Sequence, residues 1–282
     1  MEMIQTIHPI DYLVIGHLVR DMTESGMRLG GTAAYSSLTA RALGMRVGIV
    51  TAWSGELPST SLPEILVHAI PSPENTTFEN RYSDDGRIQF LHHLAERIPF
   101  SSVPEVWKRS TILHLGPVAQ ECSPLPDNSF SPALLAMTAQ GWLRKWDDTG
   151  RVTPGKWVGA EDALQQAGAV VISLEDVDGD ESEIERMAQT CRVLAVTEGT
   201  AGARLYWNND LRKFRAPEKK EVDATGAGDI FAAAFFIRLY ATRDPWEAAR
   251  FATRLASFSV TRPGLEGIPT QKEIQSSLVE VF

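Results

Sequence analysis

"EVDATGAGDIFAAAFFIRLY", residues 221–240, joins two carboxylates and a glycine-alanine-glycine turn to a long apolar run. Residues 230–240 contain no Gly or Pro, which predicts a mostly buried helix. Gly226, Ala227 and Gly228 would then form the start of that helix. The first N–H groups of a helix lack internal partners and lie at the positive end of its dipole, so the turn predicts a site for an anion such as a phosphate.

Asp229 stands at the mouth of this predicted anion site. A carboxylate there would repel a phosphate unless it takes a proton or shares a metal ion, which suggests a general base. A simpler interpretation fits the same residues: Asp229 caps the helix and the glycines form an ordinary tight turn. The residues of the turn alone do not decide between these two interpretations.

The composition indicates one sizeable domain with a small-molecule partner. A chain of 282 residues with 43% hydrophobic composition can bury a large core. The net charge of -9 and the pI of 5.2 argue against nucleic acid or an anionic membrane as partner. Cys122 and Cys191 have no metal-type or CxxC spacing, and the sequence has neither a signal-peptide pattern nor the roughly 20 apolar residues of a membrane helix. We therefore expect a cytoplasmic protein.

Strand-like apolar runs alternate with helical segments along the chain. The predicted strands cover residues 11–17, 46–52, 111–116, 134–140, 169–175 and 192–199, and the predicted helices cover residues 32–44, 160–168 and 181–190. This alternation predicts a parallel sheet that is covered by helices on both faces.

Two segments depart from the alternation. Residues 76–94 alternate in polarity around Asp85-Gly86, which predicts a hairpin, and a hairpin at the edge of the main sheet would explain it. Residues 203–215 predict a second hairpin that turns at residues 208–210. Residues 117–132 are rich in Pro and Ser and predict a loop.

The familiar phosphate-binding loops are missing from the sequence. "GRVTPGKW", residues 150–157, comes within one residue of the Walker pattern, but Trp157 replaces the hydroxyl residue that reaches Mg²⁺ and Pro154 removes an N–H. We interpret the segment as a hairpin-like turn. No G-x-G-x-x-G follows a predicted strand, which disfavours a Rossmann dehydrogenase.

Four segments together resemble the ribokinase-like (PfkB) family of sugar and nucleoside kinases. They are "LGGTAAYSS" (29–37), "AVTEGTAG" (195–202), "DATGAGD" (223–229) and "ASFSVTRPG" (256–264), and they follow the family's order. The resemblance implies an α/β, ribokinase-like fold with a central, mostly parallel sheet flanked by helices and a small β-sheet lid. Residues 1–282 would form a single kinase domain, with the lid near residues 18–30 and 72–98.

The resemblance also implies the catalytic machinery. Asp229 matches the catalytic base of the family, and Gly226, Ala227 and Gly228 match its anion hole. Asp223 would either tie the preceding strand to the turn or reach the monovalent-cation site that some members have nearby.

The resemblance places the acceptor site at Gly30 and Gly31, which follow an irregular segment. The residues alone allow a loop with Thr32 as the helix N-cap, or bare glycines against which a ligand could lie. Asp21, Gly30 and Gly31 match family positions that contact the sugar. Ribokinase has Lys and Asn where Thr32 and Tyr35 stand, so we expect Tyr35 at the acceptor site and disfavour ribose.

The predicted lid supplies further acceptor contacts. Asn80, Arg81 and Gln89 lie on its hairpin and are candidates to bind the substrate. Arg144 follows a predicted strand, where it could meet a phosphate, but a surface position is the favoured interpretation.

The donor site is implied by Thr197, Gly199 and Gly202, together with the Thr225 and Gly228 positions of the turn. Asp176 lies where the family holds the waters around magnesium; a solvated acidic loop is the competing interpretation.

These residues predict an ATP- and Mg²⁺-dependent phosphotransferase that acts on a hydroxyl of a small sugar, a polyol such as inositol, or a nucleoside. The resemblance also implies a homodimer formed through the lid. Two alternatives stay open: a catalytically silent ligand-binding relative and, less favoured, a dinucleotide-binding oxidoreductase.

Overall fold

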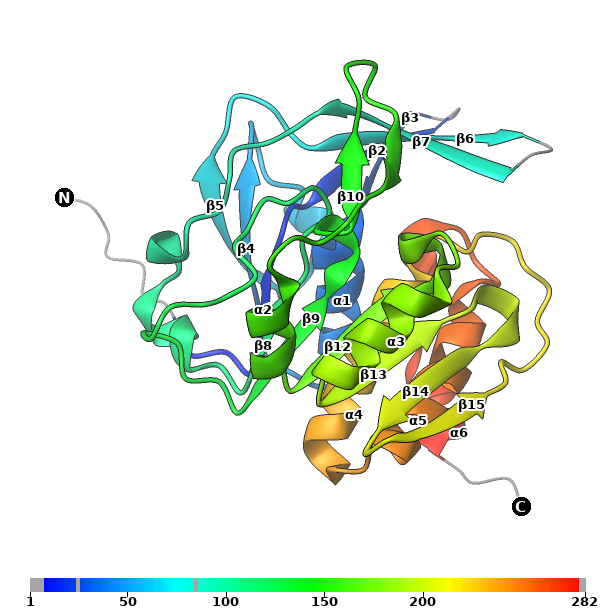
Figure 1. The fold of residues 1–282 in the computed structure, drawn as a ribbon. Coiled ribbons are helices and arrows are strands. Elements are labelled where there is room, and N and C mark those ends of the chain that lie inside the picture. Colours follow the sequence, from blue (N-terminus) through cyan, green and yellow to red (C-terminus); the bar gives the residue numbers. More distant parts are fainter. Residues whose placement is uncertain (1–7, 24–25, 84–85, 279–282) are drawn as a thin grey trace.

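The computed structural model describes residues 8–23, 26–83 and 86–278, and a nine-stranded sheet forms its centre (Figure 1). The strand order is β15-β14-β13-β12-β9-β8-β1-β4-β5. The strands are β1 (Tyr12–Ile15), β4 (Val47–Trp53), β5 (Leu66–Pro71), β8 (Ile112–Leu115), β9 (Leu134–Thr138), β12 (Ala169–Ser173), β13 (Val193–Thr197), β14 (Ala203–Trp207) and β15 (Asp210–Phe214). All neighbours from β13 to β5 are parallel, and β14 and β15 are added antiparallel. The predicted α/β fold with a mostly parallel sheet is confirmed.

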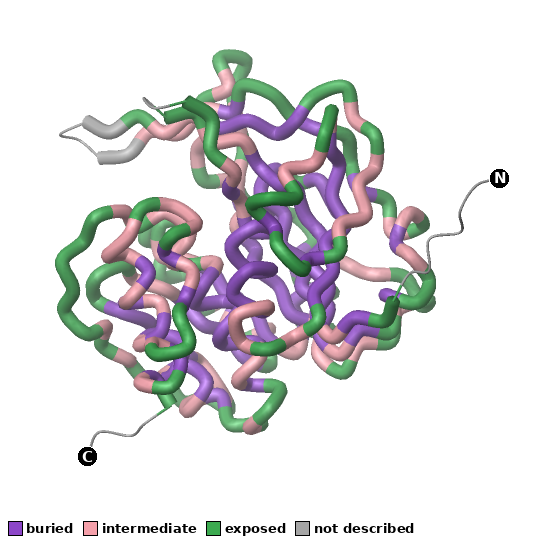
Figure 2. The backbone as a smooth tube through the Cα atoms, turned by 180° about the vertical axis from the view of Figure 1, so that it is seen from behind, coloured by how far each residue is buried: buried purple, intermediate pink, exposed green. Residues whose placement is uncertain are grey.

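Helices cover both faces of this sheet. They are α1 (Gly31–Ala42), α2 (Ala160–Gln166), α3 (Glu181–Thr190), α4 (Ala227–Thr242), α5 (Pro245–Ser259) and α6 (Gln271–Leu278). Successive strand residues point to opposite faces, so Val14 joins the core beneath α1, α4 and α5, while Leu13 and Ile15 join the core beneath α2 and α3. The buried backbone therefore runs through the centre of the molecule (Figure 2).

A second, smaller sheet lies apart from the main one (Figure 1). It contains β2 (Val19–Thr23), β3 (Gly26–Gly30), β6 (Thr77–Ser83) and β7 (Gly86–His93) in the order β3-β2-β6-β7. The two hairpins are antiparallel and join through a parallel β2–β6 pairing. The hairpin at 76–94 is confirmed, with Asp85 outside the described residues, but its placement at the edge of the main sheet is wrong. The segment before Gly30, expected to be irregular, is a strand.

The two remaining turns follow the sequence interpretation. The stretch that mimics a Walker loop, residues 150–157, begins in the turn of a small hairpin of β10 (Arg144–Trp146) and β11 (Val152–Pro154) and runs through β11. Asp147 Oδ1 holds that turn by accepting from the Thr149 and Arg151 N–H groups. Asn208 and Asn209 adopt positive φ at the β14–β15 turn, as tight hairpins require. None of the helices in the described ranges is long and apolar enough to cross a membrane.

Candidate active site

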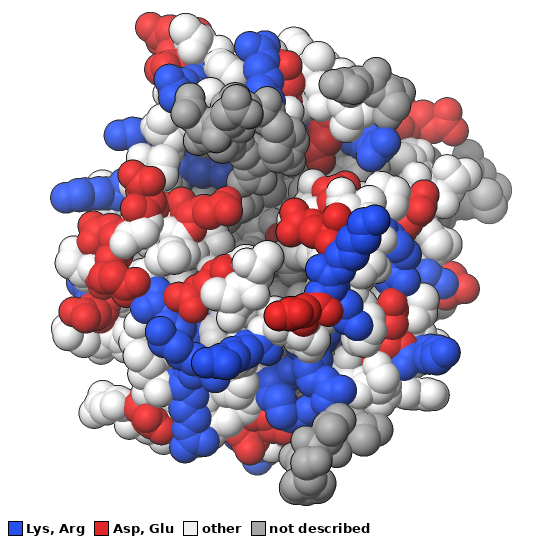
Figure 3. Space-filling model, turned by 90° about the vertical axis from the view of Figure 1, so that its right-hand side faces the viewer, with Lys and Arg blue, Asp and Glu red and all other residues white. Residues whose placement is uncertain are grey.

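A cavity of about 760 Å³ lies at the carboxyl ends of β9, β12 and β13. The small sheet lines one side of it, and the first turns of α1 and α4 line another. Open parallel sheets bind ligands at this edge. Acidic side chains flank the hollow in the middle of this face of the molecule, and basic side chains gather below it (Figure 3).

The glycine turn at the start of α4 opens into this cavity. Gly226 is the N-cap residue at φ 79°, without a side-chain capping bond, and a Cβ there would collide with the Tyr35 ring. A Cβ on Gly228 would meet no atom within 4 Å. Three free donors were expected, but the Ala227 N–H already bonds the Ala224 carbonyl at 3.2 Å. The Gly226 and Gly228 amides have no hydrogen-bond partner in the described part of the chain, so they can meet an anion.

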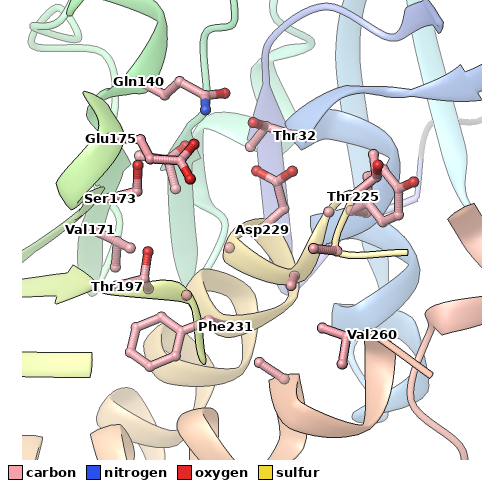
Figure 4. Close-up of a pocket in the computed structure, with 18 of the residues that line it drawn as sticks. Thr32, Gln140, Val171, Ser173, Glu175, Thr197, Thr225, Asp229, Phe231 and Val260 are labelled. Atoms are coloured by element: carbon pink, nitrogen blue, oxygen red, sulfur yellow. The ribbon is translucent and has the colours of Figure 1, made fainter. Parts of the chain in front are cut away.

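Asp229 lies in the first turn of α4, and its carboxylate lies next to the Thr32 side chain at the cavity (Figure 4). Burial raises the pKa of its carboxyl to about 6, against the opposing effects of the Thr32 hydroxyl and the Arg144 cation. A carboxylate with this pKa can accept a proton near neutral pH. Because Gly226 is the N-cap and no side chain caps the helix, the interpretation of Asp229 as a capping residue is wrong.

Asp223, by contrast, holds the turn in place. One carboxylate oxygen accepts from the Thr225 N–H and the other from the Gly264 N–H, both at 2.9 Å. Burial raises the pKa of Asp223, but the hydrogen bonds from Thr225 and Gly264 outweigh burial and lower it overall. The side chain therefore ties the turn to the segment after α5, and the expected link to the preceding strand is wrong. A monovalent cation here stays a prediction.

Side chains of the protein itself occupy the space beside Gly30 and Gly31. A Cβ on Gly30 would collide with a carboxylate oxygen of Asp21, and one on Gly31 would lie 2.7 Å from Val19 Cγ2. The glycines therefore make room for Asp21 and Val19, which line the cavity. The N-cap of α1 is Gly30, so the interpretation of Thr32 as N-cap is wrong.

Tyr35 lines the cavity but is almost completely buried, with 2% of its surface exposed. Its ring lies directly against Gly226, and burial, together with Asp21, raises the pKa of the phenol well above its ordinary value. Tyr35 thus supports the anion turn as a neutral side chain.

The small sheet brings two of its three candidate residues to the cavity. Asn80 and Gln89 face each other across β6 and β7, and Gln89 Nε2 donates to Asn80 Oδ1 at 2.9 Å. Arg81 points elsewhere: it is exposed, pairs with Glu79 at 2.7 Å and stacks on Phe90. The structure does not bring Arg81 into the site.

Arg144 differs from its prediction in the opposite way to Arg81. The sequence favoured a surface position for Arg144, and this prediction is wrong. It lines the cavity, donates to the Val118 carbonyl at 3.0 Å and lies over the Phe78 ring with 5.4 Å between the guanidinium carbon and the ring centroid. Its charge also lowers the pKa of Asp229 and of Asp176.

Asp176 is held within the short helical turn that follows β12. It accepts from the Ser173 N–H at 2.7 Å and from Gln140 Nε2 at 3.3 Å, and its own N–H donates to the Ser173 hydroxyl. Burial raises the pKa of this carboxyl. Asp176 is half-buried and tied into the turn by hydrogen bonds, whereas the neighbouring Glu175 is exposed, so the interpretation as a solvated acidic loop holds for Glu175 and not for Asp176. No group of three His, Cys, Asp or Glu able to hold a metal occurs in the described residues. Asp176 and Glu175 fit a Mg²⁺ ion held through water and donor phosphates, as is usual for this ion.

The predicted donor residues meet at the other end of the cavity. Thr197, Gly199, Gly202 and Thr225 all line it. Figure 4 shows Thr197 near Phe231 and below Val171, with Val260 farther along the same wall. Sequence reasoning missed Val171 and Phe231, which carry no motif of their own, whereas Val260 lies in the quoted segment 256–264.

Comparisons with known proteins agree with this architecture. Residues 160–271 match the model of the pfkB family of carbohydrate kinases. Ribokinase of Bacillus subtilis (strain 168) is 40% identical over 86 residues, which cover 30% of this chain and 29% of that protein. Fructokinase-1 of Oryza sativa subsp. japonica is 26% identical over 195 residues, which cover 60% of this chain and 59% of that protein. The matches thus span less than two thirds of either relative.

Solved structures match almost the whole chain. A sulfate complex of a pyrophosphate-dependent kinase in the ribokinase family has a TM-score of 0.77 at 20% identity and covers 94% of this chain and 99% of that one. A ribokinase from Thermotoga maritima has a TM-score of 0.69 at 19% identity and covers 95% of this chain and 99% of that one.

The two-sheet architecture with a site at the carboxyl edge defines a ribokinase-like fold. The family-model match over residues 160–271 and the motifs in order confirm the resemblance to the PfkB family of carbohydrate kinases. This match argues against the oxidoreductase alternative.

Proposed function

We propose that the protein transfers the γ-phosphoryl group of ATP to a hydroxyl of a small sugar, polyol or nucleoside. One observation carries the proposal: Asp229, with its raised pKa, and the open backbone of Gly228 lie on the same helical turn in one cavity. A base and an anion site must be adjacent if an attacking hydroxyl is to meet a phosphate.

In this proposal Asp229 takes the proton of the acceptor hydroxyl as the oxygen attacks the γ-phosphorus. The Gly226 and Gly228 amides hold the phosphoryl oxygens. The Ala227 N–H joins them only if its hydrogen bond to the Ala224 carbonyl breaks when the donor binds. Preorganised donors of this kind contribute on the order of 3 kcal/mol each to the transition state. Mg²⁺ bound with the donor would neutralise phosphate charge, and Asp176 would orient its waters.

The shape of the donor end favours a nucleotide over pyrophosphate. Phe231, Ala256 and Val260 add apolar wall beyond the anion turn, and Thr197 adds a hydroxyl. A pyrophosphate leaves such a wall without a partner, whereas an adenosine moiety can use it. Similar structures include pyrophosphate-dependent kinases, so the donor is a point to test.

The acceptor end is polar and suits a ligand with several hydroxyl groups. Asp21 accepts hydrogen bonds, and Asn80 and Gln89 offer both donors and acceptors. One similar structure contains a pyrophosphate-dependent kinase with myo-inositol, which makes a cyclic polyol a suitable first probe.

The small sheet is proposed as a lid that excludes water when the acceptor binds. Met22 and Met27, paired on β2 and β3, are 38% and 57% exposed and could take part in a homodimer formed through the lid. A single domain over residues 1–282 and a cytoplasmic location stay predictions.

The test is ADP release from Mg-ATP with ribose, fructose, myo-inositol, adenosine or cytidine, and phosphate release from pyrophosphate with the same acceptors. Asp229→Asn should lower kcat by about 10²–10⁴-fold or more while ATP still binds. Turnover with pyrophosphate alone would refute the nucleotide donor. Silence of the wild-type protein despite ATP binding would favour the silent ligand-binding relative, and near-normal turnover of the variant would remove Asp229 from the base role.

A further inference from the structure

Three polar side chains form a chain of hydrogen bonds from the core to the cavity. The Tyr12 hydroxyl lies 2.9 Å from His114 Nδ1, and His114 Nε2 lies 3.0 Å from Thr138 Oγ1. They come from the neighbouring strands β1, β8 and β9. Tyr12 and His114 are fully buried, whereas Thr138 lines the cavity.

The surroundings of His114 keep the imidazole neutral. Its ring meets the edges of aromatic neighbours, with 5.1 Å between the centroids of His114 and Phe236 and 5.9 Å between those of His114 and Tyr12. Burial lowers the pKa of His114 to about 3. A neutral imidazole has one N–H donor and one acceptor nitrogen, so the chain has a direction.

The Tyr12 hydroxyl sets that direction. A buried phenol must donate its proton, and within the described ranges its hydrogen-bond partner is His114 Nδ1 alone. The Nδ1 atom is then the acceptor, and the proton lies on Nε2. The opposite tautomer would leave a buried O–H without an acceptor, which is the costly arrangement.

The consequence reaches the cavity through Thr138. Because Nε2–H donates to Thr138 Oγ1, the Thr138 hydroxyl proton is free to point into the cavity. A Cβ on Gly116 would lie 2.6 Å from Thr32 Cγ2 and 3.3 Å from Thr138 Oγ1, so both threonines border the same small space. Thr32 in turn lies beside Asp229 (Figure 4).

We propose that Thr138 donates a hydrogen bond to the reacting oxygen of the acceptor, with its orientation fixed by Tyr12 and His114. The assignment rests on the proposed kinase function. The acceptor oxygen then gives its proton to Asp229 and receives one hydrogen bond from Thr138. An alcohol can do both, whereas an ammonium group at the same position has no lone pair to accept with, so the pair selects neutral hydroxyl acceptors.

The tautomer of His114 can be measured without any substrate. Nitrogen-15 NMR of the whole protein, with the resonance assigned from a His114→Gln variant, should show the proton on Nε2. A proton on Nδ1 overturns the donor role of Thr138, whatever the activity.

Kinetics test the contact itself, with the acceptor that turns over among ribose, fructose, myo-inositol, adenosine and cytidine. Thr138→Val should raise the acceptor KM about tenfold and leave the ATP KM unchanged, since one hydrogen bond is lost. Thr138→Ser keeps the hydroxyl and should restore most of the affinity. An unchanged acceptor KM in Thr138→Val refutes the contact.

A double-mutant cycle tests whether Tyr12 acts through Thr138. Tyr12→Phe should raise the acceptor KM several-fold in the wild-type background and add nothing in the Thr138→Val background. Equal effects in both backgrounds would overturn the positioning role. If no acceptor turns over in the wild-type protein, the proposed function fails, and the tautomer still decides the direction of the chain.

Discussion

The turns that open α1 and α4 are alike in sequence and in backbone. Each places glycine at the helix start, with φ of 82° at Gly31 and 79° at Gly226, and neither has a side-chain capping bond. In both turns the first amides lie at the positive end of a helix dipole, where they lack partners within the helix. A sequence pattern alone would assign them the same role.

The two turns differ in what occupies the space next to their glycines. The space at Gly30 and Gly31 is taken by Asp21 and Val19, whereas the space at Gly228 is open to the cavity. A carboxylate at the first turn repels an anion and suits a hydroxyl, while the open second turn suits a phosphate. The division of acceptor and donor ends thus depends on what the rest of the fold brings to each glycine.

The largest kinetic effect should come from a substitution that fills the open space at Gly228 in the α4 turn. Gly228→Val places a branched side chain where phosphate oxygens are expected, so the donor KM should rise about 30- to 100-fold, the equivalent of roughly 2–3 kcal/mol for a charged hydrogen bond. Gly228→Ala should give a smaller rise in the same direction. Initial rates at varied ATP, with thermal unfolding as a control, measure both.

Stability should change little in these variants, because a Cβ at this position meets no atom within 4 Å. A normal donor KM in folded Gly228→Val protein would contradict the anion site at α4.

A smaller effect is expected from disturbing the filled turn. Gly30→Ala forces the Asp21 carboxylate to move, so the acceptor KM should rise about tenfold and the donor KM should stay constant. Gly44→Ala is the matched control: this glycine follows the other end of α1 at φ 87° with open space around it, so alanine strains the backbone far from the site. Steady-state kinetics of both variants provide the test, and a rise in the donor KM of Gly30→Ala would erase the distinction between the turns.

Sequence reasoning reached the features that are local in the chain. The alternating runs predicted the main sheet, and the run after Gly228 predicted α4. The residue patterns alone did not predict the parallel β2–β6 pairing, because it joins segments that are distant in sequence, and only the family resemblance placed both segments in one lid. The glycine and charged residues of β3 hide the strand character of β3 itself. Arg144 was misplaced because its partner Phe78 lies on the other sheet. The Tyr12 chain crosses three strands and leaves no local pattern.

The pH dependence of the activity tests the difference in pKa between Asp229 in the open turn and Asp223 beside it. Asp229 must be ionised to act as a base, so kcat/KM should fall as the pH drops through about 6. Asp223 has a lowered pKa and stays ionised over that range. A pH–rate profile from pH 5 to 8 measures this. A profile that stays flat down to about pH 5 would exclude a raised pKa at the base.

The smallest effect concerns stability. A carboxyl whose pKa is raised on folding binds a proton in the folded state at a pH where the unfolded chain has lost it, so this contribution is present below about pH 4 and is lost as the pH rises through about 6. Asp229→Asn removes the buried charge and should stabilise the protein at pH 8 by roughly 1 kcal/mol, discounted for its partial exposure, which corresponds to a Tm higher by about 2 °C.

The difference in Tm between Asp229→Asn and the wild-type protein should shrink towards zero as the pH falls to about 4, because the wild-type carboxyl is then neutral as well. Scanning calorimetry across this range measures it. Asp223→Asn is the matched comparison with the opposite sign: it removes a carboxylate that accepts two backbone hydrogen bonds, so it should lower Tm at pH 8. If both variants lowered Tm equally at pH 8, the two carboxylates would both be structural, and the open turn would lose its base.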